Sequence, residues 1–104
     1  MSIEKIFLDR INSTDIINLS DYILIRLNML GVDKVFSLTG GGIMYIVDAI
    51  ARSPNVGLVC VQHESFAGIA ADAYTRAGKT VGVAIGTTGP GVTNLFTSVA
   101  AAWQ

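Results

Sequence analysis

The residues best suited to chemistry follow three apolar segments of the chain. Three glycines at 40–42 follow the first segment, Gln-His-Glu at 62–64 follows the second, and Gly-Thr-Thr-Gly-Pro-Gly at 86–91 follows the third. Ligands of open α/β sheets bind beyond the carboxyl ends of the strands. If the three segments are strands of one parallel sheet, the residues after them converge on one edge, and that edge is the expected site.

Glu64 has the most specific chemistry of these residues. A carboxylate in the first turn of a helix is favoured by the helix dipole, by about 0.3–1 kcal/mol, which would be a purely structural role. Its apolar neighbours Phe66, Ala67 and Ile69 would also remove water from it. A desolvated carboxylate can hold a shifted pKa and share a proton with a ligand nitrogen. Residue types alone leave both interpretations open.

The other candidates have simpler interpretations. The glycines at 40–42 could bind phosphate at a helix N-terminus. However, Tyr45 stands where the dinucleotide fingerprint needs its last glycine, so a structural turn is favoured there and at 86–91. His63, the only histidine, is expected to be a hydrogen-bonded structural residue. Cys60, the only cysteine, can form neither an internal disulfide nor a cysteine metal cluster. We expect it to be a small core residue and predict no metal site.

Helices and strands must hold these segments in place. We expect a leader at residues 1–19, then a helix that begins at Ser20 as N-cap and stops at Gly31. Its apolar face would comprise Ile23, Leu27 and Leu30.

The rest of the chain alternates between strands and helices. Strands are expected at 35–38, 56–61 and 80–85, with helices around 43–50 and 64–77 and a last helix after the turn at 86–91. Continuous apolar strands that alternate with helices predict an α/β fold with a parallel sheet covered by helices on both faces. A sheet of three strands would leave one edge bare, which is unusual in a finished domain. We therefore expect a piece of a larger domain.

Charge and hydropathy restrict the partners. Seven basic and eight acidic residues give a net charge of −1, and no basic stripe favours nucleic acid or an anionic membrane. No apolar run approaches the ~20 residues of a membrane span, and the first residues do not form a secretory signal. A cytoplasmic location is the default expectation.

Three motifs in order resemble the acetolactate synthase-like group of thiamine diphosphate enzymes. Residues 63–76 (HESFAGIAADAYTR) are similar to the family's His-Glu and Ala-Ala-x-Gly-Tyr-Ala-Arg stretch, and residues 87–94 (TTGPGVTN) to its Thr-Ser-Gly-Pro-Gly-x-x-Asn turn. Val35-Phe36 ahead of Gly40-Gly41 resembles its first strand and loop. The resemblance covers roughly residues 20–104 and implies an incomplete N-terminal pyrimidine-binding domain.

The resemblance also assigns roles to residues. Glu64 falls on the cofactor-activating glutamate, which hydrogen-bonds a ring nitrogen of the cofactor's aminopyrimidine and so promotes loss of a proton from the thiazolium carbon. The cofactor then reacts with a 2-oxo acid such as pyruvate, carbon dioxide leaves, and the remaining carbon group is protonated or joined to a second carbonyl. Gly40, Thr87 and Asn94 would lie near the pyrimidine pocket.

The implied parent enzyme is a lyase or transferase, a 2-oxo acid decarboxylase or carboligase of the kind used in branched-chain amino acid biosynthesis. Mg²⁺ and the diphosphate would be held by a later domain, a need for FAD stays open, and the site would form between subunits of a homodimer or homotetramer. The 104-residue chain alone is expected to be inactive.

Departures from the family pattern keep other functions open. Thr39 stands where acetolactate synthases usually have proline, and the run from Thr39 to Gly42 is similar to relatives associated with surface-sugar biosynthesis. The substrate could therefore be a sugar nucleotide or an acyl-coenzyme A. A non-catalytic remnant or interaction module is the remaining alternative.

Overall fold

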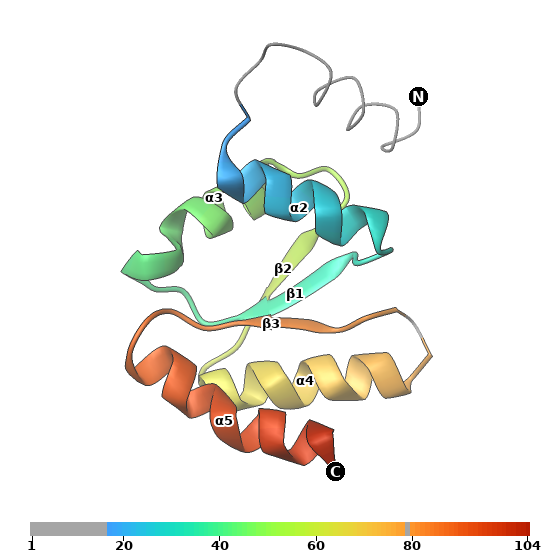
Figure 1. Cartoon of the computed structure of the whole chain (residues 1–104), viewed down its shortest axis with the longest axis vertical. Coiled ribbons are helices and arrows are strands. Elements are labelled where there is room, and N and C mark those ends of the chain that lie inside the picture. Colours follow the sequence, from blue (N-terminus) through green and yellow to red (C-terminus); the bar gives the residue numbers. More distant parts are fainter. Residues whose placement is uncertain (1–16, 79) are drawn as a thin grey trace.

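The computed structural model describes residues 17–78 and 80–104 (Figure 1). Most of the leader expected at 1–19 therefore lies outside the described residues. The elements are, in chain order, α2 (Leu19–Met29), β1 (Lys34–Ser37), the 3-10 helix η1 (Gly41–Ile43), α3 (Met44–Arg52), β2 (Gly57–Cys60), α4 (Glu64–Arg76), β3 (Val83–Ile85) and α5 (Pro90–Trp103).

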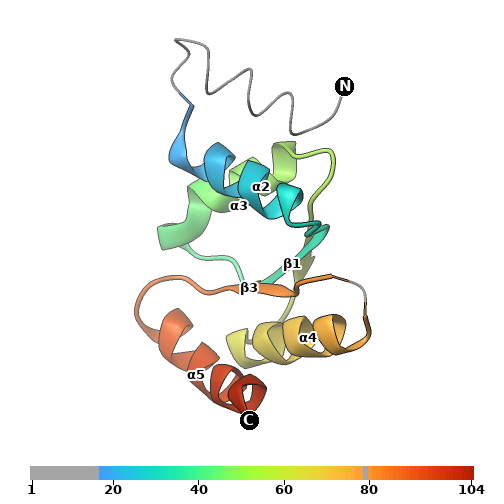
Figure 2. The same ribbon diagram turned by 45° about the vertical axis from the view of Figure 1, so that its right-hand side comes forward.

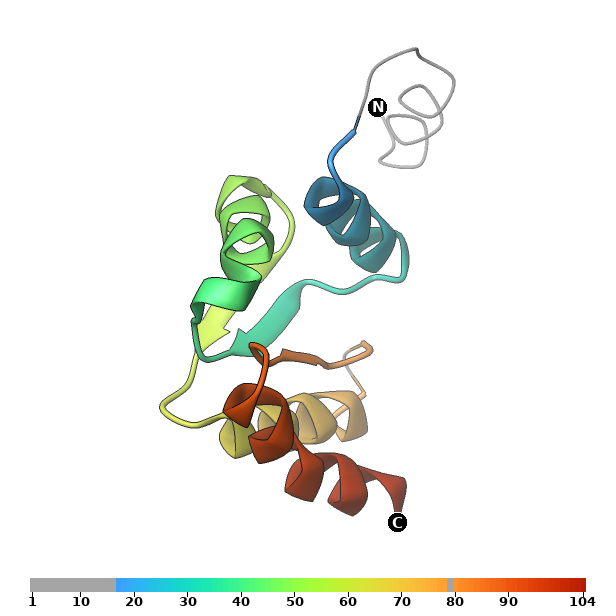
Figure 3. The same cartoon turned by 60° about the vertical axis from the view of Figure 1, so that its left-hand side comes forward.

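The three strands form one parallel sheet in the order β2-β1-β3. Helices α2 and α3 lie on one side of the sheet, and α4 and α5 lie on the other (Figure 1). The two pairs remain on opposite sides when the molecule is turned (Figure 2), and α5 lies against α4 (Figure 3). The predicted α/β class, with a parallel sheet and helices on both faces, is confirmed.

The central strand β1 supplies side chains to the hydrophobic core on both faces of the sheet. Val35 is fully buried in the core beneath α2 and α3, together with Leu24 and Ile50. Phe36, the next residue, packs on the opposite face with Ala67 and other residues of α4. This follows from the alternation of side chains along a strand. The small alanines of α4 let this helix lie close to the sheet.

Helix α2 begins earlier than predicted. The Asn18 side chain accepts a hydrogen bond from the backbone N–H of Asp21 at 3.0 Å, so Asn18 is the N-cap and the prediction of Ser20 is wrong. Ser20 is buried instead. The helix ends at Met29, so Leu30 lies beyond it and is exposed, contrary to its expected place on the apolar face. Gly31, with φ of 80°, terminates the helix as predicted.

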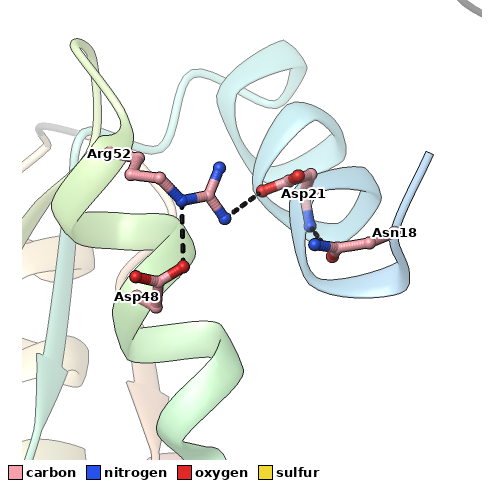
Figure 4. Close-up of polar contacts among 4 residues, drawn as sticks. All are labelled: Asn18, Asp21, Asp48 and Arg52. Carbon is pink, nitrogen blue, oxygen red and sulfur yellow. Dashed lines mark hydrogen bonds and ion pairs between the residues drawn. The ribbon is translucent and has the colours of Figure 1, made fainter.

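Polar side chains tie α2 to α3 (Figure 4). Arg52 Nη2 lies 2.8 Å from Asp21 Oδ1, and Arg52 Nε lies 2.9 Å from Asp48 Oδ2. The two carboxylates raise the pKa of the Arg52 guanidinium, the Asp21 hydrogen bond being the larger cause. Exposed ion pairs of this kind contribute only about 0–1 kcal/mol. The packing of α2 against α3 therefore depends mainly on apolar contacts between the two helices.

Strand β2 is less buried than predicted. Among the strands that the structure describes, it pairs with β1 alone and lies at the edge, and its residues Val59 and Cys60 are exposed. The expected core position of Cys60 is therefore wrong. An apolar run alone does not distinguish a central strand from an edge strand.

The third strand and the last helix also differ from their predicted bounds. Residues 80–82 lie outside β3, and the backbone N–H of Gly82 donates to Thr75 Oγ1 of α4 at 2.8 Å. Pro90 and Gly91 belong to α5 instead of the preceding turn, in line with the preference for proline in the first turn of a helix. No helix in the described part of the chain is long and apolar enough to cross a membrane.

Candidate functional site

The loops after β1 and β3 meet at the carboxyl edge of the sheet, with Thr87 between them. The backbone N–H of Gly42 donates to Thr87 Oγ1 at 3.2 Å. A Cβ atom on Gly40 would lie 2.6 Å from Thr87 Cβ, so only glycine allows this approach. On the other side of Thr87, a Cβ on Gly91 would lie 2.9 Å from Thr87 Cγ2 and 3.4 Å from Glu64 Oε1. The predicted convergence of three strand ends is confirmed.

Glu64 reaches this edge as the first residue of α4. His63 is the N-cap of the helix, and its ring nitrogen Nδ1 accepts a hydrogen bond from the backbone N–H of Ser65 at 3.2 Å. The structural role predicted for His63 is thus confirmed. The cap fixes the first turn of α4, which directs the carboxylate of Glu64 toward α5.

The Glu64 carboxylate is buried, with 7% of the residue exposed, and is paired with an amide. Asn94 Nδ2 of α5 donates to Glu64 Oε2 at 3.0 Å. This hydrogen bond is the largest cause that lowers the pKa of Glu64, followed by a bond from its own backbone N–H. Burial acts in the opposite direction, and the charge of His63 adds a smaller lowering. The hydrogen bonds outweigh desolvation, so the group is held as an anion at neutral pH.

A close crossing of α4 and α5 makes the Glu64–Asn94 pair possible. One helical turn further along each helix, a Cβ on Gly68 would lie 1.9 Å from Ser98 Oγ and 2.5 Å from Ser98 Cβ. Gly68 and Ser98 stand four residues after Glu64 and Asn94, so each lies on the same helix face as its partner in the pair. The backbone of α4 at Gly68 therefore contacts the side chain of Ser98 in α5, one turn from the Glu64 carboxylate.

The structure brings the four residues singled out from sequence into one connected group. Gly40 contacts Thr87, Glu64 bonds Asn94, and Gly91 lies between Thr87 and Glu64. Sequence reasoning missed the contact of Gly68 with Ser98 and the packing role of Gly91. The four-residue spacing of Glu64 with Gly68 and of Asn94 with Ser98 is the signal that could have found the first of these.

The group has a definite chemical capacity. A buried anionic carboxylate is a strong acceptor for an N–H donor and can share a proton with a ring nitrogen. Residues 17–78 and 80–104 contain no cluster of three or more His, Cys, Asp or Glu side chains that could hold a metal ion.

The chain matches a family model over most of its length. The model is described as "Thiamine pyrophosphate enzyme, N-terminal TPP binding domain", and it matches residues 17–104. The match includes every helix and strand of the described fold and all four candidate site residues.

Several curated proteins are similar to the chain. It is 48% identical over 75 residues to an acetolactate synthase large subunit of Parasynechococcus marenigrum, which covers 69% of this chain and 12% of the relative. It is 46% identical over 69 residues to a mitochondrial acetolactate synthase of Schizosaccharomyces pombe, covering 66% of this chain and 10% of the relative. Acetolactate synthase 2, chloroplastic, of Zea mays is 42% identical over 81 residues, or 78% of this chain and 13% of the relative. The chain therefore belongs to the thiamine pyrophosphate enzymes and represents their N-terminal TPP binding domain.

Proposed function

We propose that the chain supplies the pyrimidine-binding part of a thiamine diphosphate-dependent 2-oxo acid decarboxylase or carboligase resembling acetolactate synthase. The observation that carries the proposal is the buried, ionised carboxylate of Glu64 at the edge where the loops after β1 and β3 meet. A carboxylate with a purely structural role in the first turn of a helix needs only the helix dipole and can stay exposed to solvent. Glu64 is instead enclosed and bonded to a side chain of another helix.

The donor and acceptor groups suit an aminopyrimidine. The Glu64 carboxylate would share a proton with a ring nitrogen, and Gly40, Thr87 and Asn94 would shape the pocket around the ring. The close packing of Gly40 on Thr87 fixes the two glycine-rich loops relative to each other, so the pocket would be preorganised before binding. When bound, the cofactor supplies the electron sink that stabilises the carbon from which carbon dioxide departs.

The chain spans 10–13% of the length of the acetolactate synthases described above. The wider activity is therefore proposed for a whole protein that contains this domain. We assign to that protein a 2-oxo acid substrate such as pyruvate, Mg²⁺ bound with the diphosphate outside this chain, and a homodimeric or homotetrameric assembly. Within that whole protein, Glu64 is the catalytic residue that this chain contributes.

The test is an NMR titration of the ¹⁵N-labelled chain with thiamine diphosphate, a method that detects millimolar binding. We expect chemical-shift changes at the amides of Glu64, Thr87 and Asn94, and their loss in Glu64→Gln. Glu4→Gln, the same chemical change at the chain's other glutamate, is the matched control and should bind as the unaltered chain does. Shift changes that persist undiminished in Glu64→Gln would refute the proposed role of the site.

A further inference from the structure

We propose that Asn94 is a positioning residue for Glu64, which fixes one carboxylate oxygen and leaves the other as the oxygen that exchanges a proton. The catalytic meaning of this assignment rests on the function proposed above. The assignment itself concerns only groups of this chain, and it can be tested without a cofactor.

The geometry defines which oxygen is held. Asn94 Nδ2 lies 3.0 Å from Glu64 Oε2. Within residues 17–78 and 80–104, Asn94 is the side chain that donates a hydrogen bond to this carboxylate. An amide NH₂ group can only donate, and an unprotonated oxygen accepts better than a protonated one, so the bond favours an unprotonated Oε2. A proton that arrives at Glu64 while this bond is intact is therefore directed to Oε1, the oxygen beside Gly91.

The polar pair is not needed to hold the two helices together. One turn away, α4 and α5 already pack so closely at Gly68 and Ser98 that a Cβ on Gly68 would not fit. Apolar contacts of Leu95 with the core beneath α4 add to this attachment. If the amide served packing alone, a leucine of similar shape at position 94 would replace it without effect on the carboxylate.

The charges around Glu64 are few, which makes the effect of the amide measurable. Helix α5 (Pro90–Trp103) contains no charged residue, and neither do residues 38–43 of the loop after β1. Besides Asn94, His63 is the side chain that acts on the Glu64 carboxyl, and its influence on the pKa is smaller than that of Asn94. The Asn94 bond stabilises the anion, so removal of the bond should raise the pKa of Glu64.

The experiment is a pH titration of the chain labelled with ¹³C only in the glutamate carboxyl groups. The chain has two glutamates, Glu4 and Glu64, so two signals are expected, and Glu64→Gln assigns them. In Asn94→Leu the titration midpoint of Glu64 should move to higher pH. In Asn94→Asp it should move further, because a second carboxylate then faces the first.

Three controls separate this effect from general disturbance. The Glu4 signal should stay unchanged in every variant. Thr97→Ala alters an exposed residue of the same helix and should leave the Glu64 midpoint in place. His63→Gln removes the other nearby group and should raise the midpoint by less than Asn94→Leu does. Circular dichroism at each pH restricts the comparison to folded protein.

A Glu64 midpoint that stays in place in folded Asn94→Leu would overturn the assignment. If Asn94→Asp is unfolded at neutral pH, Asn94→Leu alone decides, because it adds no charge. The result is independent of the proposed function. A shifted midpoint in a chain whose thiamine diphosphate signals persist in Glu64→Gln would support the positioning role and refute the cofactor role of Glu64. An unshifted midpoint in a chain whose thiamine diphosphate signals are lost in Glu64→Gln would support the cofactor role and refute the positioning role.

Discussion

Replacement of Gly68 by alanine tests whether the crossing of α4 and α5 controls the Glu64–Asn94 pair. The added Cβ would lie 2.5 Å from Ser98 Cβ, whereas ordinary contact begins at 3.4 Å, so the helices must separate by about 0.9 Å at this point because packed interiors leave no spare room. Ser98 Oγ can rotate away, but its Cβ moves only with the backbone of α5. The same displacement one turn earlier would stretch the 3.0 Å bond between Asn94 and Glu64 past the ~3.5 Å limit of a hydrogen bond.

The energetic effect follows from two opposing contributions. Overpacking of this kind costs about 1–3 kcal/mol, and alanine in place of glycine within a helix returns about 1 kcal/mol. The clash is between two Cβ atoms, which move only with the backbone. We therefore expect a cost at the upper end of this range and a net loss of about 2 kcal/mol in the free energy of unfolding. That is a large share of the roughly 5–15 kcal/mol by which a domain is stable.

Urea unfolding and the Glu64 carboxyl titration measure the two consequences. Gly68→Ala should lower the urea midpoint and raise the pKa of Glu64. Adding Ser98→Gly removes the clashing atoms, so the double variant should be more stable than the sum of the single changes predicts. Gly41→Ala is the matched control, because nothing lies within 4 Å of the Cβ that it adds. A Gly68→Ala chain with unchanged stability and an unchanged Glu64 midpoint would refute the argument.

Three further results are expected. Thr87→Val keeps the shape that packs on the glycine loop but removes the acceptor for the N–H of Gly42, so urea unfolding should show a loss of about 0.5–1.5 kcal/mol that Thr87→Ser largely avoids. The pKa of Glu64 is lower in the folded than in the unfolded chain, so its contribution to stability is complete above its ordinary value and is lost as the pH falls through the folded value. The stability of Glu64→Gln, measured over the same acidic range, should therefore depend less on pH, and equal slopes would contradict this. Trp103, the only tryptophan, is 91% exposed on a helix that also exposes Phe96, so its fluorescence should shift to shorter wavelength as the concentration rises if the chain self-associates, and an emission maximum independent of concentration would count against self-association.

The order of elements could be predicted because local signals mark it. Apolar runs identify the strands, and glycine stops the helix at Gly31, where φ is positive. The N-cap of α2 was harder to predict, because Asn18 and Ser20 are both good N-cap residues. Only the three-dimensional position of the Asp21 N–H decides between them.

The site could be predicted in its residues but not in its contacts. Motif positions identified Glu64 and Asn94 separately, while the hydrogen bond between them depends on how two helices cross. That crossing is set by Gly68 against Ser98, a contact between residues 30 positions apart. The exposure of Cys60 likewise depends on the strand order, which places β2 at an edge.

The position of β1 at the centre of the sheet has a consequence for folding during synthesis. Val35 pairs with Leu58, 23 positions later, and with Val83, 48 positions later. At about 5–20 residues per second, the ribosome completes β3 roughly 2–10 s after β1. During that interval at least one edge of β1 is free to pair with a strand of another chain. The strand that ends up most buried is thus the one that translation leaves without partners for longest.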